Sequence, residues 1–403
     1  MAMMKRIKDK GLILLMILIL TGCNFLGIGK KEEEVKLREA HQVKAGIARI
    51  DKQGNIILDM SVQELGEEGY ETGDVITITI NEKSFDMPVG IMVNEVQAGE
   101  EICLFEYGKG GDDIVKLMFK NGMFSSAAGL CEVKLIDDDP GYQLLWNDGV
   151  DISVPVIVDM YEKQGHSDAY PTDEDVYVRT YIREDYPSLN DEEYANFREV
   201  ETVGIKDDTL YRSSSPINPK MNRNLEADEA SRNANIKTII NMADYTAEMK
   251  RYEGYDESYY KDCDIIALNI TAEFASASFE KKLAQGLRFL IKHDGPYLIH
   301  CTAGKDRTGF SIAILECLMG AEADEVVSDY MRTFDNFYGI RLGSVVYNNV
   351  ADKNIKHDLA VAFGIDSIFD DVDLSKCAED YLAKIGMSEE EISKLKQKLQ
   401  AEQ

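Results

Sequence analysis

The sequence predicts two folded parts in series: a mostly β domain, and after it an α/β domain whose central sheet is flanked by helices. Short β-branched or alternating runs, separated by turn residues, fill residues 42–160. Beyond residue 195, strand-like segments alternate with segments of helical periodicity. The chain has 403 residues, 44% of them apolar and 29% charged, so it is long enough for two cores and does not have the composition of a disordered protein.

The N-terminus has the order of an export signal. Basic residues at positions 5, 6, 8 and 10 precede an unbroken apolar run at 12–20, and "LTGC" follows at 20–23. "LTGC" resembles the lipobox of bacterial lipoproteins, which implies that residues 1–22 are a signal peptide and that Cys23 carries a lipid. The alternative is a short uncleaved anchor, although the apolar run is too short to cross a bilayer as a helix. Both readings predict an exported chain held at the outer face of a bacterial cell membrane.

The net charge argues against some partners. The whole chain carries −29, and removal of residues 1–22 takes away four bases and Asp9, leaving 40 Lys and Arg against 72 Asp and Glu, or −32. Such a surface repels nucleic acid and bulk anionic membrane. We therefore expect no nucleic-acid partner, anchoring through the lipid, and a strictly local attraction for any anionic substrate.

Residues 23–41 are predicted to be a charged tether, because "GKKEEEVKLREAH" has no apolar face. The other six cysteines are widely spaced and form no CxxC pair, which excludes the usual zinc and dithiol patterns. We expect no metal and no cofactor. Most of these cysteines are expected to be buried thiols, and a disulfide stays open for an exported chain.

The β domain is predicted to span residues 42–165. Its strand-like runs are "AGIARI", "NIILDM", "VITITI" and "ISVPVIVDM", and its turns include "KQGN", "ETGD" and "NDGV". "GKGG" at 108–111 is expected to be a hairpin turn, because a phosphate loop needs a following Lys-Ser/Thr and a helix.

The stretch from "GIARIDKQGNIILDM" through "GDVITITI" to "FKNGMFSSAAGL" resembles the C-terminal β-barrel domain of the SAM hydroxide adenosyltransferase family. The resemblance implies a barrel-like fold. In that family a catalytic half precedes the barrel, and here that half is missing. The resemblance therefore implies a binding or positioning module without adenosyl chemistry.

The α/β domain is predicted to span residues 166–403, with "HSDAYPTDED" as the join. "IKTIINMA" and "YLIH" are expected to be buried strands. Helices are expected in "ASFEKKLAQGLRFLIKHDG", ending at Gly295, and in "GFSIAILECLMG", ending at Gly320. The last stretch predicts two amphipathic helices, the second capped by Ser388 with Glu391 three residues on.

The decamer "HCTAGKDRTG" at 300–309 lies between a predicted strand and a predicted helix. A loop in that position points backbone N–H groups and the positive end of a helix at one spot, which makes an anion site. Cys301 and Arg307 give the spacing CxxxxxR, and Ala303 and Gly304 are small enough for close backbone approach. The alternative is a glycine-containing turn beside a buried cysteine.

These residue types suit attack on phosphorus. The helix end, the loop N–H groups and Arg307 all favour the thiolate of Cys301, and the planar fork of Arg307 can grip two phosphoryl oxygens. Thr308 is placed to hydrogen-bond the sulfur. We expect His300 to tune the sulfur through a hydrogen bond rather than to act as a base.

The decamer resembles the signature loop of the protein tyrosine phosphatase superfamily, and "AGKDRTG" resembles that of its bacterial branch of tyrosine and lipid phosphatases. "NFREV" at 196–200, "LYRSSSP" at 210–216 and "SDYMRTFDN" at 328–336 are similar to flanking motifs of that branch. The resemblance implies that Cys301 is the nucleophile and Arg307 the phosphate clamp. It also implies a phosphate-binding loop formed by Thr302, Ala303, Gly304, Lys305 and Thr308.

The general acid has two candidates. In the resembling branch an aspartate of a DLR motif is a candidate acid, but "NMADYTAEM" has Asn241 at that place. Asp244 and Asp306 are the substitutes, and each has a structural alternative, as a turn residue and as a hydrogen-bonding residue respectively. In the resembling enzymes, a pair like Lys305 and Asp306 accompanies activity on phosphoinositides as well as phosphotyrosine.

The sequence thus favours a phosphate monoester hydrolase with a cysteinyl-phosphate intermediate, foremost a protein tyrosine phosphatase. A phosphoinositide or inositol polyphosphate phosphatase is the alternative of the same chemistry. A non-catalytic envelope lipoprotein is the alternative of another class. The expected partners are a phosphorylated protein or a phosphorylated small molecule or lipid head group, and the membrane through the N-terminal lipid.

Overall fold

The structure is a computed structural model that describes residues 40–97, 99–106, 113–136, 141–167 and 180–400. The predicted signal peptide, Cys23 and nearly all of the tether lie outside these residues, as do the "GKGG" turn and most of the expected join. Among the described helices, none is long and apolar enough to cross a membrane.

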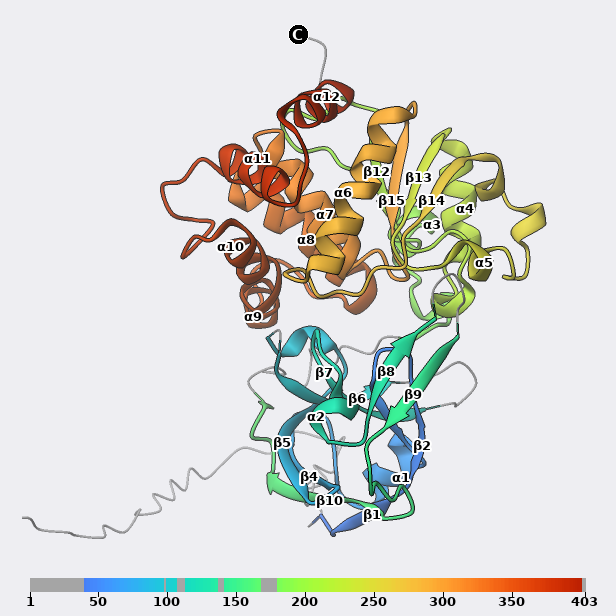
Figure 1. The fold of residues 1–403 in the computed structure, drawn as a ribbon, viewed down its shortest axis with the longest axis vertical. Coiled ribbons are helices and arrows are strands. Elements are labelled where there is room, and N and C mark those ends of the chain that lie inside the picture. Colours follow the sequence, from blue (N-terminus) through green and yellow to red (C-terminus); the bar gives the residue numbers. More distant parts are fainter. Residues whose placement is uncertain (1–39, 98, 107–112, 137–140, 168–179, 401–403) are drawn as a thin grey trace, which may run out of the picture. The chain divides into compact units, whose positions relative to one another are not determined.

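The N-terminal part is built on one large sheet with the strand order β1-β10-β4-β5-β6-β7-β3-β2, and β8 and β9 pair as a separate hairpin. Only Gly46 separates β1 from β2 in the chain, although these strands stand at opposite ends of the sheet order. The sheet therefore curls until its edges nearly meet (Figure 1). The expectation of a mostly β, barrel-like domain is confirmed. The elements of this part are β1 (Val43–Ala45), β2 (Ile47–Ile50), β3 (Ile56–Leu58), α1 (Val62–Glu67), β4 (Val75–Ile80), β5 (Lys83–Gly90), β6 (Glu101–Glu106), β7 (Ile114–Phe119), α2 (Phe124–Ala127), β8 (Cys131–Leu135), β9 (Tyr142–Trp146) and β10 (Val156–Glu162).

Strand β4 shows why the sequence forms this sheet. In "VITITI", Ile76, Ile78 and Ile80 are buried in the barrel core, while Thr77 and Thr79 point the other way and hydrogen-bond side chains of β5. The period of two places one apolar and one polar face on the strand.

The C-terminal part contains a five-stranded sheet with the order β11-β12-β15-β13-β14, in which all neighbours are parallel except β11 and β12. Its strands are β11 (Arg198–Glu199), β12 (Leu210–Ser213), β13 (Thr238–Asn241), β14 (Asp264–Ala267) and β15 (Tyr297–His300). Its helices are α3 (Asp191–Tyr194), α4 (Asn224–Asn233), α5 (Thr246–Met249), α6 (Ala277–Lys292), α7 (Asp306–Leu318), α8 (Ala323–Tyr338), α9 (Val345–Ala351), α10 (His357–Phe363), α11 (Leu374–Lys384) and α12 (Glu389–Leu399).

Helices cover both faces of this sheet (Figure 1). Ile239 and Leu298 belong to a core shared with residues of α4, whereas their chain neighbours Ile240 and Ile299 belong to the core formed with α6, α7 and α8. Each central strand is thus apolar on both sides, which explains its continuous apolar run. The four parallel strands also end at one edge, and the loop after β15 lies there.

Some predicted boundaries differ from the structure. Helix α6 ends at Lys292 rather than at Gly295, and Pro296, which disfavours helical backbone in the residue before it, closes this segment. The strand predicted in "ISVPVIVDM" begins at Val156, after Pro155, which has no N–H to donate to the sheet. The predicted cap of the last helix is confirmed, because Ser388 and Glu391 form a reciprocal capping box.

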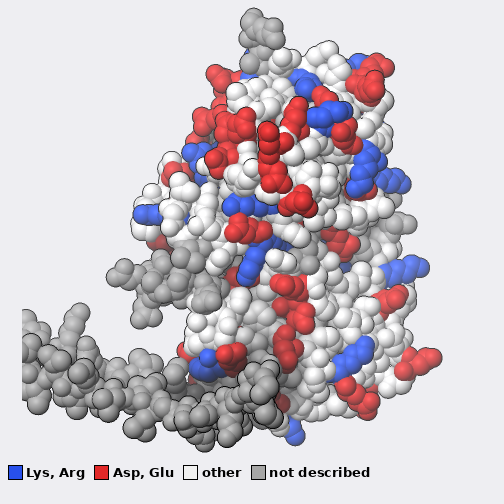
Figure 2. Space-filling view, turned by 90° about the vertical axis from the view of Figure 1, so that its left-hand side faces the viewer, with Lys and Arg blue, Asp and Glu red and all other residues white. Residues whose placement is uncertain are grey.

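The acidic composition is visible on the surface. Figure 2 shows Asp and Glu side chains spread over much of one face, with Lys and Arg side chains between them. A substrate anion therefore gains little from the surface at large and needs a local site.

Candidate active site

Cys301 lies where strand β15 becomes a loop. Residues 301–305 connect β15 to α7, which begins at Asp306, and Cys301 is 3% exposed. The first N–H groups of an α-helix have no partner within the helix. The start of α7 therefore adds free donors and a positive dipole end to the loop.

The acidity of Cys301 separates it from the other described cysteines. Burial raises the pKa of Cys301, but the positive charge of Arg307 and hydrogen bonds from Thr308 outweigh burial, and the pKa is lowered. A larger fraction of this thiol is therefore ionised near neutral pH. The six described cysteines are all free thiols, and burial raises the pKa of the other five, which are Cys103, Cys131, Cys263, Cys317 and Cys377.

Thr308 faces the sulfur from the first turn of α7. Its hydroxyl is buried and has no other hydrogen-bond partner in the described part of the chain. Both its hydroxyl and its backbone N–H lower the pKa of Cys301. Thr308 therefore stabilises the thiolate directly.

Side chains from two flanking motifs hold the carbonyl groups of the loop. Asn196 Nδ2 donates to the carbonyl oxygens of Ala303 and Gly304 at 3.2 and 3.3 Å. Arg212 Nη2 donates to the carbonyl oxygen of Gly304 at 2.9 Å. Because these carbonyls are satisfied from behind, the loop can present its N–H groups to an anion on the other side.

Gly304 lets the loop approach the end of β12. Its φ is +66°, and a Cβ built there would lie 2.1 Å from the carbonyl oxygen of Ser213. Next to this contact, the Ser215 N–H donates to the carbonyl oxygen of Thr302 at 3.1 Å. Only glycine fits this position without moving the loop.

A buried ion-pair network contacts the loop through Arg212. Asp329 on α8 accepts a hydrogen bond from Arg198 Nε at 2.8 Å and another from Arg212, and Thr333 Oγ1 accepts from both arginines. Burial raises the pKa of Asp329, but the charges of Arg198 and Arg212 outweigh it and lower the pKa to about 2. The three motifs flanking the decamer in the sequence thus meet behind the loop of residues 301–305.

Arg307 is held across the loop by backbone carbonyl groups. Its Nη1 donates to the carbonyl oxygens of Ile270 and Met242 at 3.0 and 3.3 Å, and its Nη2 donates to Thr302 Oγ1 at 3.2 Å. The two carbonyls follow β14 and β13. The guanidinium is therefore fixed at the carboxyl edge of the sheet while its side chain stays partly exposed.

His300 makes hydrogen bonds through both ring nitrogens, one of them to the backbone of Cys301, and its expected role of tuning the sulfur through a hydrogen bond stays a prediction. Its Nδ1 lies 3.1 Å from the carbonyl oxygen of Cys301 and its Nε2 lies 2.9 Å from the hydroxyl of Tyr260, so both ring nitrogens are in use. Since a carbonyl only accepts, Nδ1 donates and Nε2 accepts from Tyr260. Burial lowers the pKa of His300 to about 4, which keeps the ring neutral.

Asp244 lies buried just after β13 and is 2% exposed. Its Oδ2 accepts from Asn241 Nδ2 at 3.0 Å, and its Oδ1 accepts from Asn218 Nδ2 at 3.1 Å and from the Tyr252 hydroxyl at 2.8 Å. Asn241 Nδ2 also donates to the Tyr260 hydroxyl at 3.0 Å. Asp244 therefore belongs to the polar layer that orients His300.

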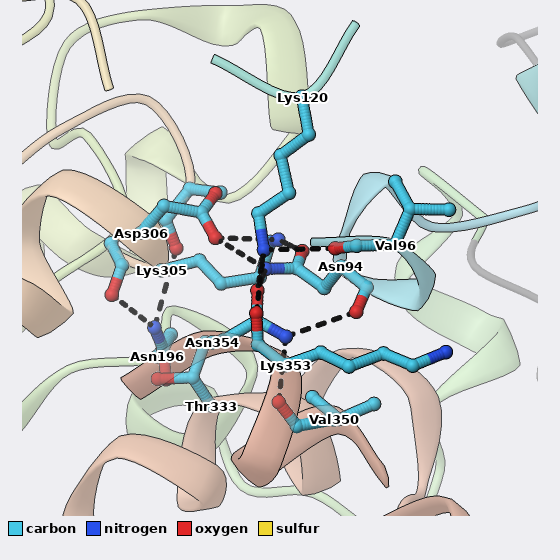
Figure 3. Close-up of polar contacts among 12 residues, drawn as sticks. Asn94, Val96, Lys120, Asn196, Lys305, Asp306, Thr333, Val350, Lys353 and Asn354 are labelled. Carbon is cyan, nitrogen blue, oxygen red and sulfur yellow. Dashed lines mark hydrogen bonds and ion pairs between the residues drawn. The ribbon is translucent and has the colours of Figure 1, made fainter. Parts of the chain in front are cut away.

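Asp306 lies at the start of α7 in a different setting. Its Oδ1 accepts from Asn94 Nδ2 at 2.8 Å and from Lys305 Nζ at 3.0 Å, and Lys305 also donates to Asn94 Oδ1 (Figure 3). Burial raises the pKa of Asp306, but Lys305 and Asn94 outweigh it, and the pKa is lowered. The Asp306 side chain is 28% exposed.

Asn94 belongs to the β domain, on a 3₁₀ turn between β5 and β6. Its Nδ2 donates to Asn354 Oδ1 at 2.6 Å, and Asn354 Nδ2 donates back to the Asn94 carbonyl oxygen at 2.9 Å. Lys120 of the β domain also donates to Asn354 (Figure 3). Burial lowers the pKa of Lys120 to about 8. Asn354 lies on a π-helical turn, a distortion that is frequent at functional sites.

The described residues contain no group of three or more His, Cys, Asp or Glu side chains that could hold a metal ion. The side chains described at this site bring together a thiol, a guanidinium and carboxyl groups.

A family model described as tyrosine phosphatase family matches residues 169–401, which is more than half of the chain. The chain belongs to the tyrosine phosphatase family. The match covers the decamer and its flanking motifs and leaves out the β domain.

A curated relative carries the same kind of description. The chain is 46% identical over 52 residues to the triple specificity protein phosphatase PtpB of Mycobacterium tuberculosis (strain ATCC 25618 / H37Rv). The match spans 13% of this chain and 19% of that relative. Among solved structures, an uncharacterized conserved protein from Thermotoga maritima matches 32% of this chain and 41% of its own, with 14% identity and a TM-score of 0.22.

The sequence placed the phosphatase-family residues together but missed their partners. The structure brings Cys301, Arg307 and Thr308 to one spot, with Asp306 at its rim. No motif or spacing in the sequence indicates that Asn94 contacts Asp306 or that Tyr260 binds His300.

Proposed function

We propose that this protein hydrolyses phosphate monoesters through a cysteinyl-phosphate intermediate. The observation that carries the proposal is the pairing of one acidified thiol, Cys301, with a fixed guanidinium, Arg307, in a loop whose carbonyls are bound from behind. A binding-only loop needs donors but has no need of a thiolate, so this pairing argues against the non-catalytic alternative.

The reaction has two balanced steps. The thiolate of Cys301 attacks phosphorus, the bond from phosphorus to the ester oxygen breaks, and the leaving oxygen takes a proton from a carboxylic acid. Water then attacks the phosphorus, the sulfur–phosphorus bond breaks, and the carboxylate takes the proton from water. Arg307 and the loop N–H groups stabilise the phosphoryl oxygens in both transition states.

Asp306 is the general acid in this proposal. Its side chain is partly exposed at the rim of the loop, whereas both oxygens of Asp244 accept hydrogen bonds in a buried layer. The lowered pKa of Asp306 means that the free enzyme holds it ionised near neutral pH. A bound phosphate dianion raises that pKa, because like charges disfavour each other, and so supplies the protonated form.

Phosphotyrosine is the proposed substrate class, and it rests on the family match and on the relative named as a protein phosphatase. Phosphoinositides are the second candidate, favoured by Lys305 next to Asp306 in the loop. A panel of phosphotyrosine peptide, phosphoserine peptide, phosphoinositide and inositol hexakisphosphate discriminates between them through their kcat/KM values.

The export signal and the lipobox support a lipid-anchored enzyme at the outer face of the cell membrane, with residues 1–22 removed, 23–41 as tether, 42–165 as β domain and 166–403 as phosphatase domain. Mass spectrometry of the mature N-terminus tests this part. Diacylglycerol on Cys23, lost in Cys23→Ala, is the expected result, and an unmodified N-terminus contradicts it.

Turnover of para-nitrophenyl phosphate by the full chain tests the proposed reaction. Cys301→Ser removes the nucleophile and is expected to abolish turnover, and acid quenching of the wild type during turnover is expected to trap one phosphoryl group on Cys301. Equal rates for Cys301→Ser and the wild type would falsify the proposal.

A further inference from the structure

A cavity of about 180 Å³ opens beside the phosphate loop. One wall comes from the β domain, and the other comes from the phosphatase domain. The surface that the walls present is mainly apolar. Its principal apolar side chains are Val93, Met118, Phe119 and Met123 from the β domain and Phe274 from the phosphatase domain.

The cavity shares residues with the proposed catalytic site. Asp306 forms part of its wall, and so does Thr271, which follows the residue whose carbonyl oxygen accepts from Arg307. The proposed proton donor therefore forms part of the cavity wall. Neither Cys301 nor Arg307 lines the cavity, so it is not the phosphate site itself.

The β-domain wall is fixed in place at its contact with the loop. Met92, 2% exposed, packs in the hydrophobic core of the phosphatase domain, and the neighbouring Asn94 hydrogen-bonds Asp306. Lys353 Nζ donates to the carbonyl oxygen of Glu95 at 2.7 Å on the other side of the same turn. Core packing and hydrogen bonds on both sides hold this turn against the phosphate loop.

The size and lining of the cavity point to one occupant. An apolar cavity of about 150 Å³ is known to take a benzene molecule, so this cavity has room for about one aromatic ring. The partly buried Phe119 and Phe274 offer ring contacts, which favour a flat aromatic group over a polar inositol.

We propose that the cavity binds the aromatic ring of the phosphate ester, so that the β domain completes the substrate site and selects aryl phosphates. This inference rests on the proposed function, because it assigns the ring to the leaving group of an ester whose phosphate sits on the loop. Met118 and Met123 are then specificity-determining residues.

Calorimetric titration of the full chain with two phosphonates tests the inference without turnover. Methylphosphonate presents the anionic group alone, and phenylphosphonate adds one ring. The wild type is expected to bind phenylphosphonate about ten- to hundredfold more tightly than methylphosphonate, which is the range expected for burying an aromatic ring.

Met118→Gln keeps the side-chain length and replaces an apolar group with a polar one. It is expected to reduce the preference for phenylphosphonate at least about fivefold. Met123→Gln is the second variant, and Met123 is 39% exposed, so this change leaves the core intact. Met160→Gln, the same change on β10 outside the cavity, is the matched control and keeps the wild-type preference.

The outcomes separate the two proposals. Equal affinity of the wild type for both phosphonates, or an undiminished preference in both cavity variants, overturns this inference and leaves the phosphate site standing. Failure of the wild type to bind either phosphonate overturns the proposed function and this inference together.

Discussion

Asn94 and Asp306 lie 212 residues apart in the chain, and the amide of Asn94 donates to the carboxylate of Asp306 at 2.8 Å. Lys305 joins the same contact from the loop. A side chain of the β domain thus acts on a residue of the phosphate loop. The protonation of Asp306 is the property that this contact sets most directly.

Asn94→Asp is expected to move the pH profile of turnover. The new carboxylate replaces a donor with a like charge and competes for Lys305, so the pKa of Asp306 rises. If Asp306 must be protonated to act, turnover falls as pH rises through its pKa, and the variant's descending limb lies about one unit higher. The measurement is kcat for para-nitrophenyl phosphate as a function of pH.

Asn147→Asp provides the control for this change. Asn147 is an exposed residue of the β domain that donates to the carbonyl of Gly129 at 2.9 Å. It makes the same chemical change without touching the loop, and its profile is expected to match the wild type. A descending limb that stays in place in Asn94→Asp contradicts the role of Asn94.

Gly304→Ala is expected to disable the loop. The added Cβ would lie 2.1 Å from the carbonyl oxygen of Ser213, so the loop must shift. Because the loop carries the proposed reacting groups, its displacement is expected to lower turnover about 100-fold or more. Gly364→Ala isolates the clash, because Gly364 has a φ of +68° close to the +66° of Gly304 but nothing within 4 Å. Comparable losses of turnover in both variants would point to backbone strain rather than to the clash.

The core of the candidate site can be predicted from the sequence because it is local. Cys301, Arg307 and Thr308 fall within eight consecutive residues, and one strand-to-helix turn brings them together. The central sheet was also predictable, since its strands are continuously apolar and alternate with helices. The chemistry of the loop therefore needs little information from elsewhere in the chain.

The surroundings of the loop depend on long-range packing, and the sequence does not encode them in any spacing. The Asn94–Asp306 contact requires the turn after β5 to pack on another domain, and Tyr260 reaches His300 from a segment 40 residues away. The two hydrogen-bond partners of His300 could not be predicted from the sequence for this reason. These partners are the Tyr260 hydroxyl and the carbonyl oxygen of Cys301.

Asp329→Asn is expected to destabilise the fold by about 3–5 kcal/mol, because it removes the carboxylate that pairs with the buried Arg198 and Arg212. The loss is measured as the free energy of unfolding in urea. Asp335→Asn on the same helix, at an exposed position, is the control and is expected to change little.

Asp329→Asn is also expected to change how the stability of the fold depends on pH. The pKa of Asp329 is about 2 in the folded chain and lies below its unfolded value of 3.8. The stability that this carboxylate contributes is therefore present above the unfolded pKa and is lost as pH falls from about 4 to about 2. Asp329→Asn lacks this part of the acid sensitivity. If the free energies of unfolding of the wild type and the variant fall equally over that pH range, Arg198 and Arg212 do not lower the pKa of Asp329.

Two substitutions of Arg307 distinguish the two roles proposed for it. Arg307→Ala removes the positive charge that lowers the pKa of Cys301, so the pH midpoint for alkylation of Cys301 by iodoacetamide is expected to rise. Arg307→Lys keeps the charge, and its midpoint stays nearer the wild type. Both variants lose the planar fork and are expected to lose turnover by about 100-fold or more.

Cys301→Ser shows how much of the measured alkylation occurs at Cys301. The other described cysteines have raised pKa values and are expected to react more slowly. If Arg307→Lys retains both the low midpoint and full turnover, the geometry of the fork is irrelevant and charge alone suffices. If Arg307→Ala leaves the midpoint unchanged, the thiolate depends on Thr308 and the start of α7 instead. We expect the alkylation midpoint to depend on the positive charge at position 307 and turnover to depend on the planar guanidinium. This result would assign activation of the nucleophile to the charge of Arg307 and stabilisation of the transition state to its shape.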